Sequence, residues 1–277
     1  MTAGQIIAAE RLAVFALVAA VVGSFLNVCI YRIPLGKSVV HPRSSCPACG
    51  HTIRAWHNVP VASWVLLRGR CADCHAPISA RYPFVELANT GLWLWAWFRF
   101  GPSAGTLLLA PFLSAMLALF FTDWDHQLLP DRITLPAAAL GLATAWWNPR
   151  LDPVSAMLFE RWPAGRIGAS VAGALLGYGL FYVIWLAWKI LFKRDSMGGG
   201  DLKLMLAVGA FLGVPGVLLT ILFGSVVGTL VSIPFLLAGR WNLKRELPFG
   251  CFLTPAAVFA ALYGREALIW YLETLFP

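Results

Sequence analysis

Charged residues are scarce in this sequence. Only 12% of its 277 residues are Asp, Glu, Lys or Arg, whereas soluble globular chains contain about 25%. Acidic residues are scarcer than basic ones: the chain has 13 Asp and Glu and 21 Lys and Arg. The chain is also 59% hydrophobic, with apolar runs long enough to cross a bilayer as helices. This composition excludes an ordinary soluble enzyme and indicates an integral membrane protein.

The apolar runs predict an all-α fold. We expect a polytopic membrane helix bundle of about eight spans with a small cytoplasmic zinc-binding loop module. The expected spans cover residues 11–31, 85–100, 104–122, 132–147, 167–192, 201–213, 216–238 and 250–272. The same pattern divides the chain into a first transmembrane helix at 1–31, a four-cysteine loop at 32–84 and a membrane core at 85–277.

The distribution of basic residues predicts the orientation of these spans. An even number of spans puts both termini on one side of the membrane. If that side is outside, most Lys and Arg fall in the inner segments, as the positive-inside bias requires. The loop from Arg32 to Arg81 is then cytoplasmic, as are the turns after Phe121, Phe192 and Gly239. The net charge of +8 is explained by topology, so we expect no nucleic-acid partner.

The loop between the first two spans contains two Cys-x-x-Cys pairs. Their members are Cys46, Cys49, Cys71 and Cys74. The pairs are separated by 21 residues, slightly more than the usual gap of about 15–20, and two such pairs indicate a structural zinc site in which each pair directs two sulfurs at one ion. A loop of this size has too small a core to fold alone, and bound metal supplies the missing stability. Four thiolates complete a tetrahedral site, so we expect no catalysis at this metal.

Other interpretations of the cysteines remain open. Disulfides are disfavoured in a cytoplasmic loop, and two matched redox pairs would be superfluous. A histidine of the loop could replace a cysteine ligand; the candidates are His51, His57 and His75. Tight turns are needed where Gly50 and His75 follow the two pairs. Cys29 and Cys251 lie in apolar surroundings, and we interpret them as inert core thiols.

Acids near membrane spans are costly and usually functional. Asp123, Asp125 and Asp131 follow the third expected span, and Asp201 opens the sixth after three glycines. Asp123 and Asp125 are two residues apart, so they cannot share one helix face. We expect Asp123 to face inward and Asp125 to be a solvated charge. For Asp131, a role as the N-cap of the fourth expected span is the alternative to a catalytic role.

Asp201 also has a capping alternative, but the preceding glycines favour a different role. Glycine lets another part of the chain approach closely. Asp123 and Asp201 would meet from two helices at one membrane face, and two close carboxylates cannot both ionise easily. One then keeps a proton while the other activates water, which is the chemistry of an aspartic protease.

The motifs of this chain resemble those of the bacterial type IV prepilin peptidases, a group of GxGD membrane aspartic proteases. The matching stretches are residues 23–28, 31–34, both Cys-x-x-Cys pairs, 81–87, 123–131 and 197–203. The resemblance implies cleavage of the basic leader of type IV prepilins or type II secretion pseudopilins, after a glycine. By motif position it implies that Asp123 and Asp201 are the catalytic pair, within a membrane peptidase core at 85–277.

The resemblance also implies a second activity and a location. Many members methylate the new N-terminal amine with S-adenosylmethionine, and the four loop cysteines match those of the bifunctional members. No glycine-rich strand–turn–helix signature locates the methyl-donor site. The expected location is the inner membrane, with the active site facing the cytoplasm. Two departures from the family pattern are Cys251, where proline is usual, and a longer outer segment at 148–166.

Two rival functions fit parts of the sequence. A proton-coupled transporter also uses membrane carboxylates, but it would place them near the middle of the bilayer on several helices. A membrane-tethered zinc ribbon would bind a partner such as nucleic acid, yet the loop lacks the interleaved aromatic pattern for stacking bases. Neither rival accounts for the paired aspartates at one membrane face.

Overall fold

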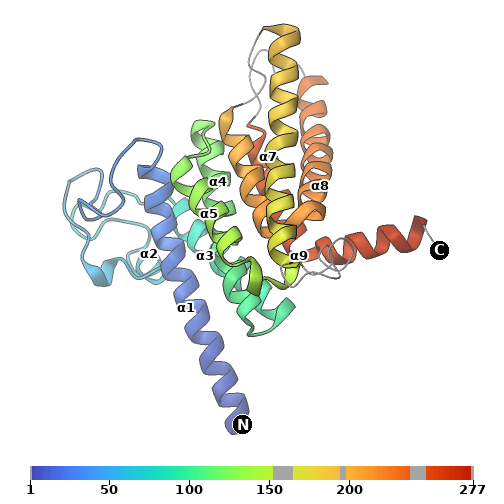
Figure 1. The fold of residues 1–277 in the computed structure, drawn as a ribbon. Coiled ribbons are helices and arrows are strands. Elements are labelled where there is room, and N and C mark those ends of the chain that lie inside the picture. Colours follow the sequence, from blue (N-terminus) through green and yellow to red (C-terminus); the bar gives the residue numbers. More distant parts are fainter. Residues whose placement is uncertain (1, 152–164, 194–197, 238–247, 276–277) are drawn as a thin grey trace. The chain divides into compact units, whose positions relative to one another are not determined.

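The structure, a computed structural model, describes residues 2–151, 165–193, 198–237 and 248–275. Helices make up the fold in these ranges (Figure 1). They are α1 (Ala3–Arg32), α2 (Ala62–Leu66), α3 (Arg81–Phe100), α4 (Ala104–His126), α5 (Asp131–Ala143), α7 (Gly165–Phe192), α8 (Gly199–Leu237) and α9 (Gly250–Leu275), with the short 3-10 turns η1 (Ala55–His57), η2 (Ala145–Trp147) and η3 (Pro149–Leu151). The prediction of an all-α fold is confirmed for the described residues.

Five helices of the described part are long and apolar enough to cross a membrane. They are Gly4–Arg32, Ala104–His126, Gly165–Phe192, Gly199–Pro234 and Gly250–Thr274. The expected spans at 201–213 and 216–238 both fall in α8. The segment at 132–147 forms a helix of only 13 residues, about 20 Å long against a hydrocarbon core of about 30 Å. Helix α3 has 20 residues but too little apolar character. A multi-span bundle is thus confirmed, with five helices rather than eight meeting both conditions.

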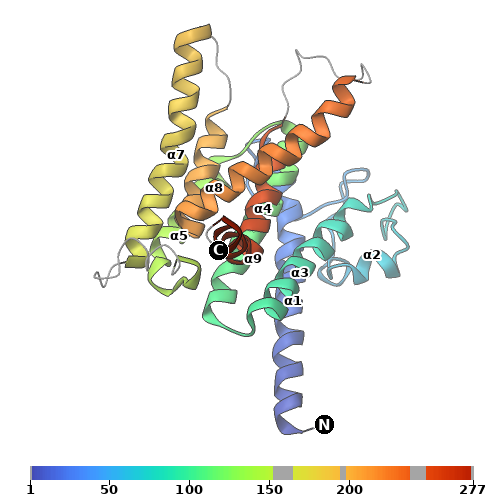
Figure 2. The same ribbon diagram turned by 90° about the vertical axis from the view of Figure 1, so that its right-hand side faces the viewer.

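Helix α8 consists of two arms that meet at Gly213. This residue has φ 68° and ψ −170°, a conformation that interrupts the helix and that glycine adopts without strain. Pro215 follows two residues later and opens the second arm. Figure 2 shows the two arms meeting at an angle rather than forming a straight rod. The short connection expected between the sixth and seventh spans is therefore a helix break at Gly213 alone.

The chain forms two compact units, Met1–Gly101 and Pro102–Pro277. In the first unit α1 packs closely on α3. A Cβ on Gly23 would lie 2.8 Å from the Cα of Glu86, and the Asn89 amide donates to the carbonyl of Ala19 at 2.7 Å. The two stretches at 23–28 and 81–87 are therefore packing partners. The three-part division at 1–31, 32–84 and 85–277 stays a prediction.

In the second unit, glycines allow α7 and α8 to touch along their backbones. A Cβ on Gly173 would overlap the carbonyl oxygen of Gly209 and lie 2.6 Å from the Cα of Gly213. The hydroxyl of Ser170 donates to the carbonyl of Ala210 at 2.6 Å. Small residues with interhelical hydrogen bonds are the usual means of close helix packing in membranes. This contact holds the first arm of α8, and with it Asp201, against the bundle.

We expect Gly173→Leu to destabilise the second unit, because α7 and α8 must separate to admit the side chain. Overpacking of this kind costs about 3 kcal/mol or more when backbones must move. The matched control is Gly179→Leu on the same helix, where a Cβ would meet nothing within 4 Å. Thermal unfolding in detergent should show a lower apparent Tm for Gly173→Leu only. Equal Tm values for the two variants would contradict the close contact.

Candidate active site and metal centre

Two aspartates from different helices are buried together in the second unit. Asp123 lies in the last turn of α4 and Asp201 in the first turn of α8. Their exposed fractions are 5% and 8%. The two carboxylates are close enough to interact electrostatically. The sequence pattern predicts that these two residues meet, and their role as a catalytic pair stays a prediction.

Close approach of α9 shapes the surroundings of Asp123. The backbone N–H of Cys251, in the first turn of α9, donates to Asp123 Oδ2 at 2.8 Å. A Cβ on Gly250 would lie 2.7 Å from the same oxygen. Glycine at position 250 therefore lets the start of α9 reach the carboxylate. The sequence pattern marked Cys251 as an inert thiol, and its backbone contact with Asp123 was missed because it depends on tertiary packing.

Of the three glycines before Asp201, Gly200 has the role of close approach that the sequence predicted. A Cβ on Gly200 would lie 2.8 Å from the Cβ of Leu129. Leu129 is buried in the turn that follows α4, which ends at Gln127 in the left-handed conformation with φ 51°. Gly200 thus lets α8 begin directly against this turn. The turn and the glycines together set Asp201 beside Asp123.

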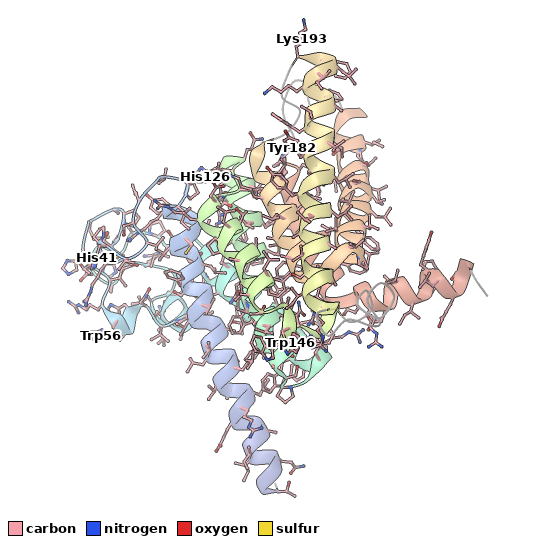
Figure 3. The ribbon with its side chains drawn as sticks, in the orientation of Figure 1. His41, Trp56, His126, Trp146, Tyr182 and Lys193 are labelled. Carbon is pink, nitrogen blue, oxygen red and sulfur yellow. The ribbon has the colours of Figure 1, made fainter. Side chains whose placement is uncertain are left out.

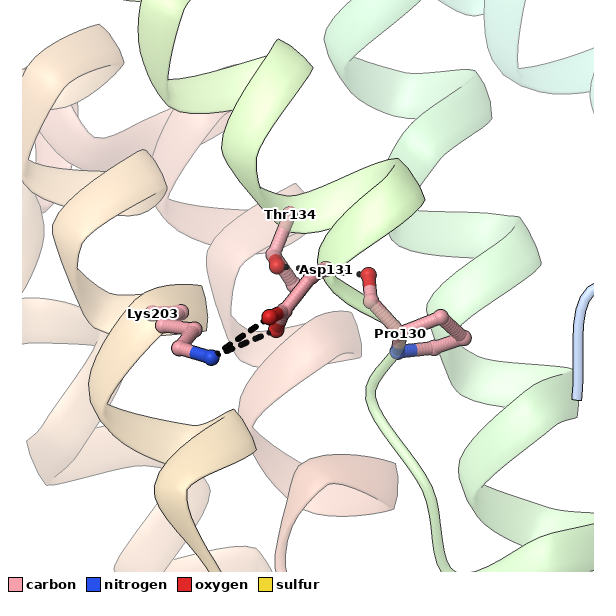
Figure 4. Close-up of polar contacts among 4 residues, drawn as sticks. All are labelled: Pro130, Asp131, Thr134 and Lys203. Atoms are coloured by element: carbon pink, nitrogen blue, oxygen red, sulfur yellow. Dashed lines mark hydrogen bonds and ion pairs between the residues drawn. The ribbon is translucent and has the colours of Figure 1, made fainter.

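The other two acids of the 123–131 stretch are placed differently. Asp125 is exposed, as expected. The expected capping role of Asp131 is wrong, because Pro130 occupies the N-cap position and Asp131 is the first residue of α5. Asp131 instead forms an ion pair with Lys203 Nζ, at 2.7 Å to both carboxylate oxygens (Figure 4). The pair is partly exposed and contributes about 0–1 kcal/mol to stability. It joins the start of α5 to the first turns of α8.

The four loop cysteines converge in the first unit. Cys46, Cys49, Cys71 and Cys74 offer sulfurs that all lie within 4.8 Å of one another. The Sγ atoms of Cys46 and Cys74 are 3.8 Å apart, which matches the separation of about 3.8 Å that Zn–S bonds of about 2.3 Å give in a tetrahedron. It is far longer than an S–S bond of about 2.05 Å. The cysteines therefore fit a tetrahedral metal ion, and possible zinc binding is supported.

The two Cys-x-x-Cys turns close with the same backbone hydrogen bond. The N–H of Gly50 donates to the carbonyl of Cys46 at 2.8 Å, and the N–H of His75 donates to that of Cys71 at 3.1 Å. Gly50 and His75 have φ 71° and 57°, so each turn closes in the left-handed region, as expected. Backbone N–H groups of Cys49 and Ala48 lower the pKa of Cys46 to about 7. A readily formed thiolate is the state that a metal ion requires.

Some sequence features lie outside the described residues or outside the candidate sites. Residues 152–164 of the longer segment at 148–166, and residues 194–197 before the glycines, are not described. Cys29 and Cys251 are free and buried, as expected of core thiols. No histidine belongs to the cysteine cluster of the described chain. Its four sulfurs alone complete a ligand set.

Comparisons with known proteins agree on one family. Residues 17–100 match "Bacterial Peptidase A24 N-terminal domain", and residues 96–233 match "Type IV leader peptidase family". The chain is similar to the prepilin leader peptidase/N-methyltransferase of Aeromonas hydrophila, with 36% identity over 91% of this chain and 90% of that protein. The protein of the same name from Pseudomonas putida is 37% identical, over 88% of each chain.

A third relative of that name, from Myxococcus xanthus, is 40% identical over 81% of this chain and 63% of its own. No solved structure matches this chain. The two matched family regions together reach from α1 to the second arm of α8 and so include parts of both units. With a membrane-spanning helical bundle, a four-cysteine cluster and relatives matched along nearly its whole length, this chain belongs to the type IV leader peptidase family.

Proposed function

We propose that this chain is a membrane aspartic endopeptidase that removes the leader peptide of type IV prepilins or type II secretion pseudopilins. The observation that carries this proposal is the burial of Asp123 and Asp201 side by side, from two helices. The names of the relatives supply the substrate class. A transporter is not favoured, because both carboxylates lie at helix ends rather than midway along the spans.

In peptide hydrolysis one carboxylate acts as the general base and the other, protonated, acts as a hydrogen-bond donor. The ionised carboxylate takes a proton from water, and the resulting hydroxide attacks the scissile carbonyl carbon. The protonated carboxylate donates a hydrogen bond to the carbonyl oxygen and stabilises its developing negative charge. When the C–N bond breaks, the leaving amine takes up the proton. The reaction needs neither a covalent intermediate nor a catalytic metal.

The metal and the second activity belong to the same proposal. Zinc held by Cys46, Cys49, Cys71 and Cys74 would stabilise the cysteine loop, and four thiolates leave no position for a catalytic water. We also propose that the chain methylates the new N-terminal amine with S-adenosylmethionine. The support for this step is the N-methyltransferase part of the relatives' printed name.

A single assay tests both activities. Purified protein in detergent is mixed with a prepilin and S-adenosylmethionine, and the product is analysed by mass spectrometry. Loss of the leader mass reports cleavage, and a further gain of one methyl group reports transfer. An unchanged prepilin mass would overturn the proposed peptidase. A cleaved but unmethylated product would overturn only the proposed methyl transfer.

We further propose that the cysteine loop and the aspartate pair face the cytoplasm, with lipid around the spans. Positive-inside charge supports this orientation. Figure 3 agrees within the second unit, because His126 and Lys193 lie toward one end of it and Trp146 lies toward the other. The ends of α4 and α7 therefore face the same way, as the predicted topology requires.

Thiol labelling tests the orientation. Cys49 is exposed, so a membrane-impermeant reagent should reach it only after the cytoplasmic side is opened, and best after metal removal. Intact cells should therefore give no labelling of Cys49. A Cys49→Ser variant is the control for labelling at other thiols. Labelling of Cys49 from the periplasm in intact cells would reverse the proposed orientation.

A further inference from the structure

We infer that the backbone N–H of Cys251 holds the negative charge of the aspartate pair on Asp123, which makes Asp123 the ionised base and Asp201 the proton carrier. This inference rests on the proposed peptidase function and deepens it. Cys251 itself is a positioning residue, because it acts on the carboxylate rather than on substrate.

The contact with Cys251 is specific to one of the two carboxylates. The N–H of Cys251 lies 2.8 Å from Asp123 Oδ2, and hydrogen bonds to an ionised acceptor are about twice as strong as neutral ones. The donor belongs to the first turn of the 26-residue helix α9, where the helix dipole also favours a negative charge. Since Asp123 is only 5% exposed, water competes little with this donor.

The side chain of Cys251 fixes the position of that N–H. Its thiol donates to the carbonyl oxygen of Phe120 at 3.6 Å, one turn before Asp123 on α4. The start of α9 is thus fastened to α4 at two points. Gly250 completes the arrangement, because any Cβ there would lie 2.7 Å from Asp123 Oδ2 and displace the carboxylate.

Asp201 has different surroundings. Among the described residues, no donor hydrogen-bonds its carboxylate, although it is equally buried at 8% exposure. Two close carboxylates cannot both ionise easily, so a charge held on Asp123 by its donor leaves the shared proton to Asp201.

The remaining ionisable groups near the pair do not reverse this asymmetry. From α5 and α8, Asp131 and Lys203 pair with each other. On α4, Asp125 is exposed and two residues away from Asp123, on the other side of the helix. From α9, the Cys251 thiol lies against both the carbonyl oxygen of Phe120 and the carboxylate of Asp123. Both described groups that favour a charge on the pair, the N–H and the thiol of Cys251, therefore act on Asp123 and not on Asp201.

Cys251→Pro removes this N–H together with the thiol, and Cys251→Ala removes the thiol alone, so the difference between the two variants tests the inference. Proline is tolerated in the first turn of a helix. The measurement is the pH profile of kcat/KM for leader cleavage. If Asp123 carries the charge, the N–H stabilises the singly and doubly ionised pair equally. Loss of the N–H then raises the midpoint pH of the acid limb, where the pair first ionises, by about one pH unit. The midpoint of the alkaline limb, where the second carboxylate ionises, stays in place.

The opposite assignment gives a different profile. If Asp201 carried the charge, the N–H would stabilise only the doubly ionised pair. Cys251→Pro would then leave the acid limb in place and move the alkaline limb upward, which would overturn the inference. A profile with neither limb moved would also overturn it. Because the pair titrates as a unit, the two limbs and not single residues are compared.

Two further variants separate the N–H from the thiol and from misfolding. Cys251→Ala keeps the N–H and loses only the thiol, so its acid limb should rise less than that of Cys251→Pro; an acid limb moved as far as in Cys251→Pro would overturn the inference. Gly250→Ala keeps the N–H but pushes the carboxylate away from it, and should also raise the acid limb. An unaltered protein that cleaves at no pH would overturn the proposed function and this inference together, whereas unmoved limbs in an active Cys251→Pro protein would overturn this inference only.

Discussion

Asp123→Asn and Asp201→Asn should each lower the rate of leader cleavage by about a thousandfold or more. Removing one positioned acid or base costs about 10²–10⁴ in rate, and here the two carboxylates act as a unit. Both residues are buried at the ends of helices, and an amide has nearly the shape of the carboxylate. Both variants should therefore insert in the membrane and keep their metal. Mass spectrometry of the prepilin product measures the loss.

The matched controls are Asp125→Asn and Asp131→Asn in the same stretch. Asp125 is exposed, and Asp131 contributes one partner of a partly exposed ion pair worth about 0–1 kcal/mol. These variants should retain cleavage within about tenfold of the unaltered protein. Methylation of a pre-cut substrate should survive all four changes if the two reactions use separate sites. Substantial cleavage by Asp201→Asn would refute the proposed mechanism.

The difference between the two groups of acids shows what the sequence could predict. The spacing predicted that Asp123 and Asp125 lie on different helix faces, and the neighbouring apolar run favoured Asp123 as the inward one. Asp123 is buried and Asp125 is exposed, as expected. The apolar runs predicted the helices in the same way, since each run reports local composition. The meeting of Asp123 and Asp201 was expected because both sit at helix ends on one predicted membrane face.

Features that depend on packing between distant segments were not predictable. The N–H of Cys251 reaches Asp123 across 128 positions, and no local pattern marks a backbone group as a donor to a distant carboxylate. Asp131 looked like a helix cap because it precedes an apolar run, but its partner Lys203 comes from another helix. The two expected spans at 201–213 and 216–238 are the two arms of α8, separated only by the non-helical residue Gly213. A single glycine is enough to change the direction of the chain there, so no separate loop is needed.

The cysteine loop was the most predictable part of the fold, for a physical reason. Two Cys-x-x-Cys pairs specify their own local turns, and the proposed metal ion, rather than a hydrophobic core, would join them. The left-handed residues at Gly50 and His75 appear where those turns must close. What the pattern left undetermined was how the loop attaches to the helices. The N–H of Val61 donates to the buried carboxylate of Glu86 on α3 at 2.7 Å, which ties the loop to that helix.

Removal of the metal should unfold the loop between α1 and α3. Structural zinc in small modules contributes about 10–16 kcal/mol of apparent binding free energy at pH 7, more than the core of such a loop can replace. Metal analysis should find about one zinc per chain in the unaltered protein. Cys46→Ser and Cys71→Ser should abolish it and expose residues 38–79 to limited proteolysis. Cys29→Ala, which alters a buried thiol of α1 outside the cluster, should keep both metal and protection.

The consequences for catalysis should be indirect, because the sulfurs and the aspartates belong to different compact units. Loss of zinc should therefore reduce cleavage through an unfolded loop, while the acid and alkaline limbs of the pH profile stay in place for whatever activity remains. Readdition of zinc should restore protection from the protease together with activity in metal-stripped protein, but not in Cys46→Ser. A preparation that is free of metal, resistant to proteolysis in the loop and fully active would refute a structural zinc site.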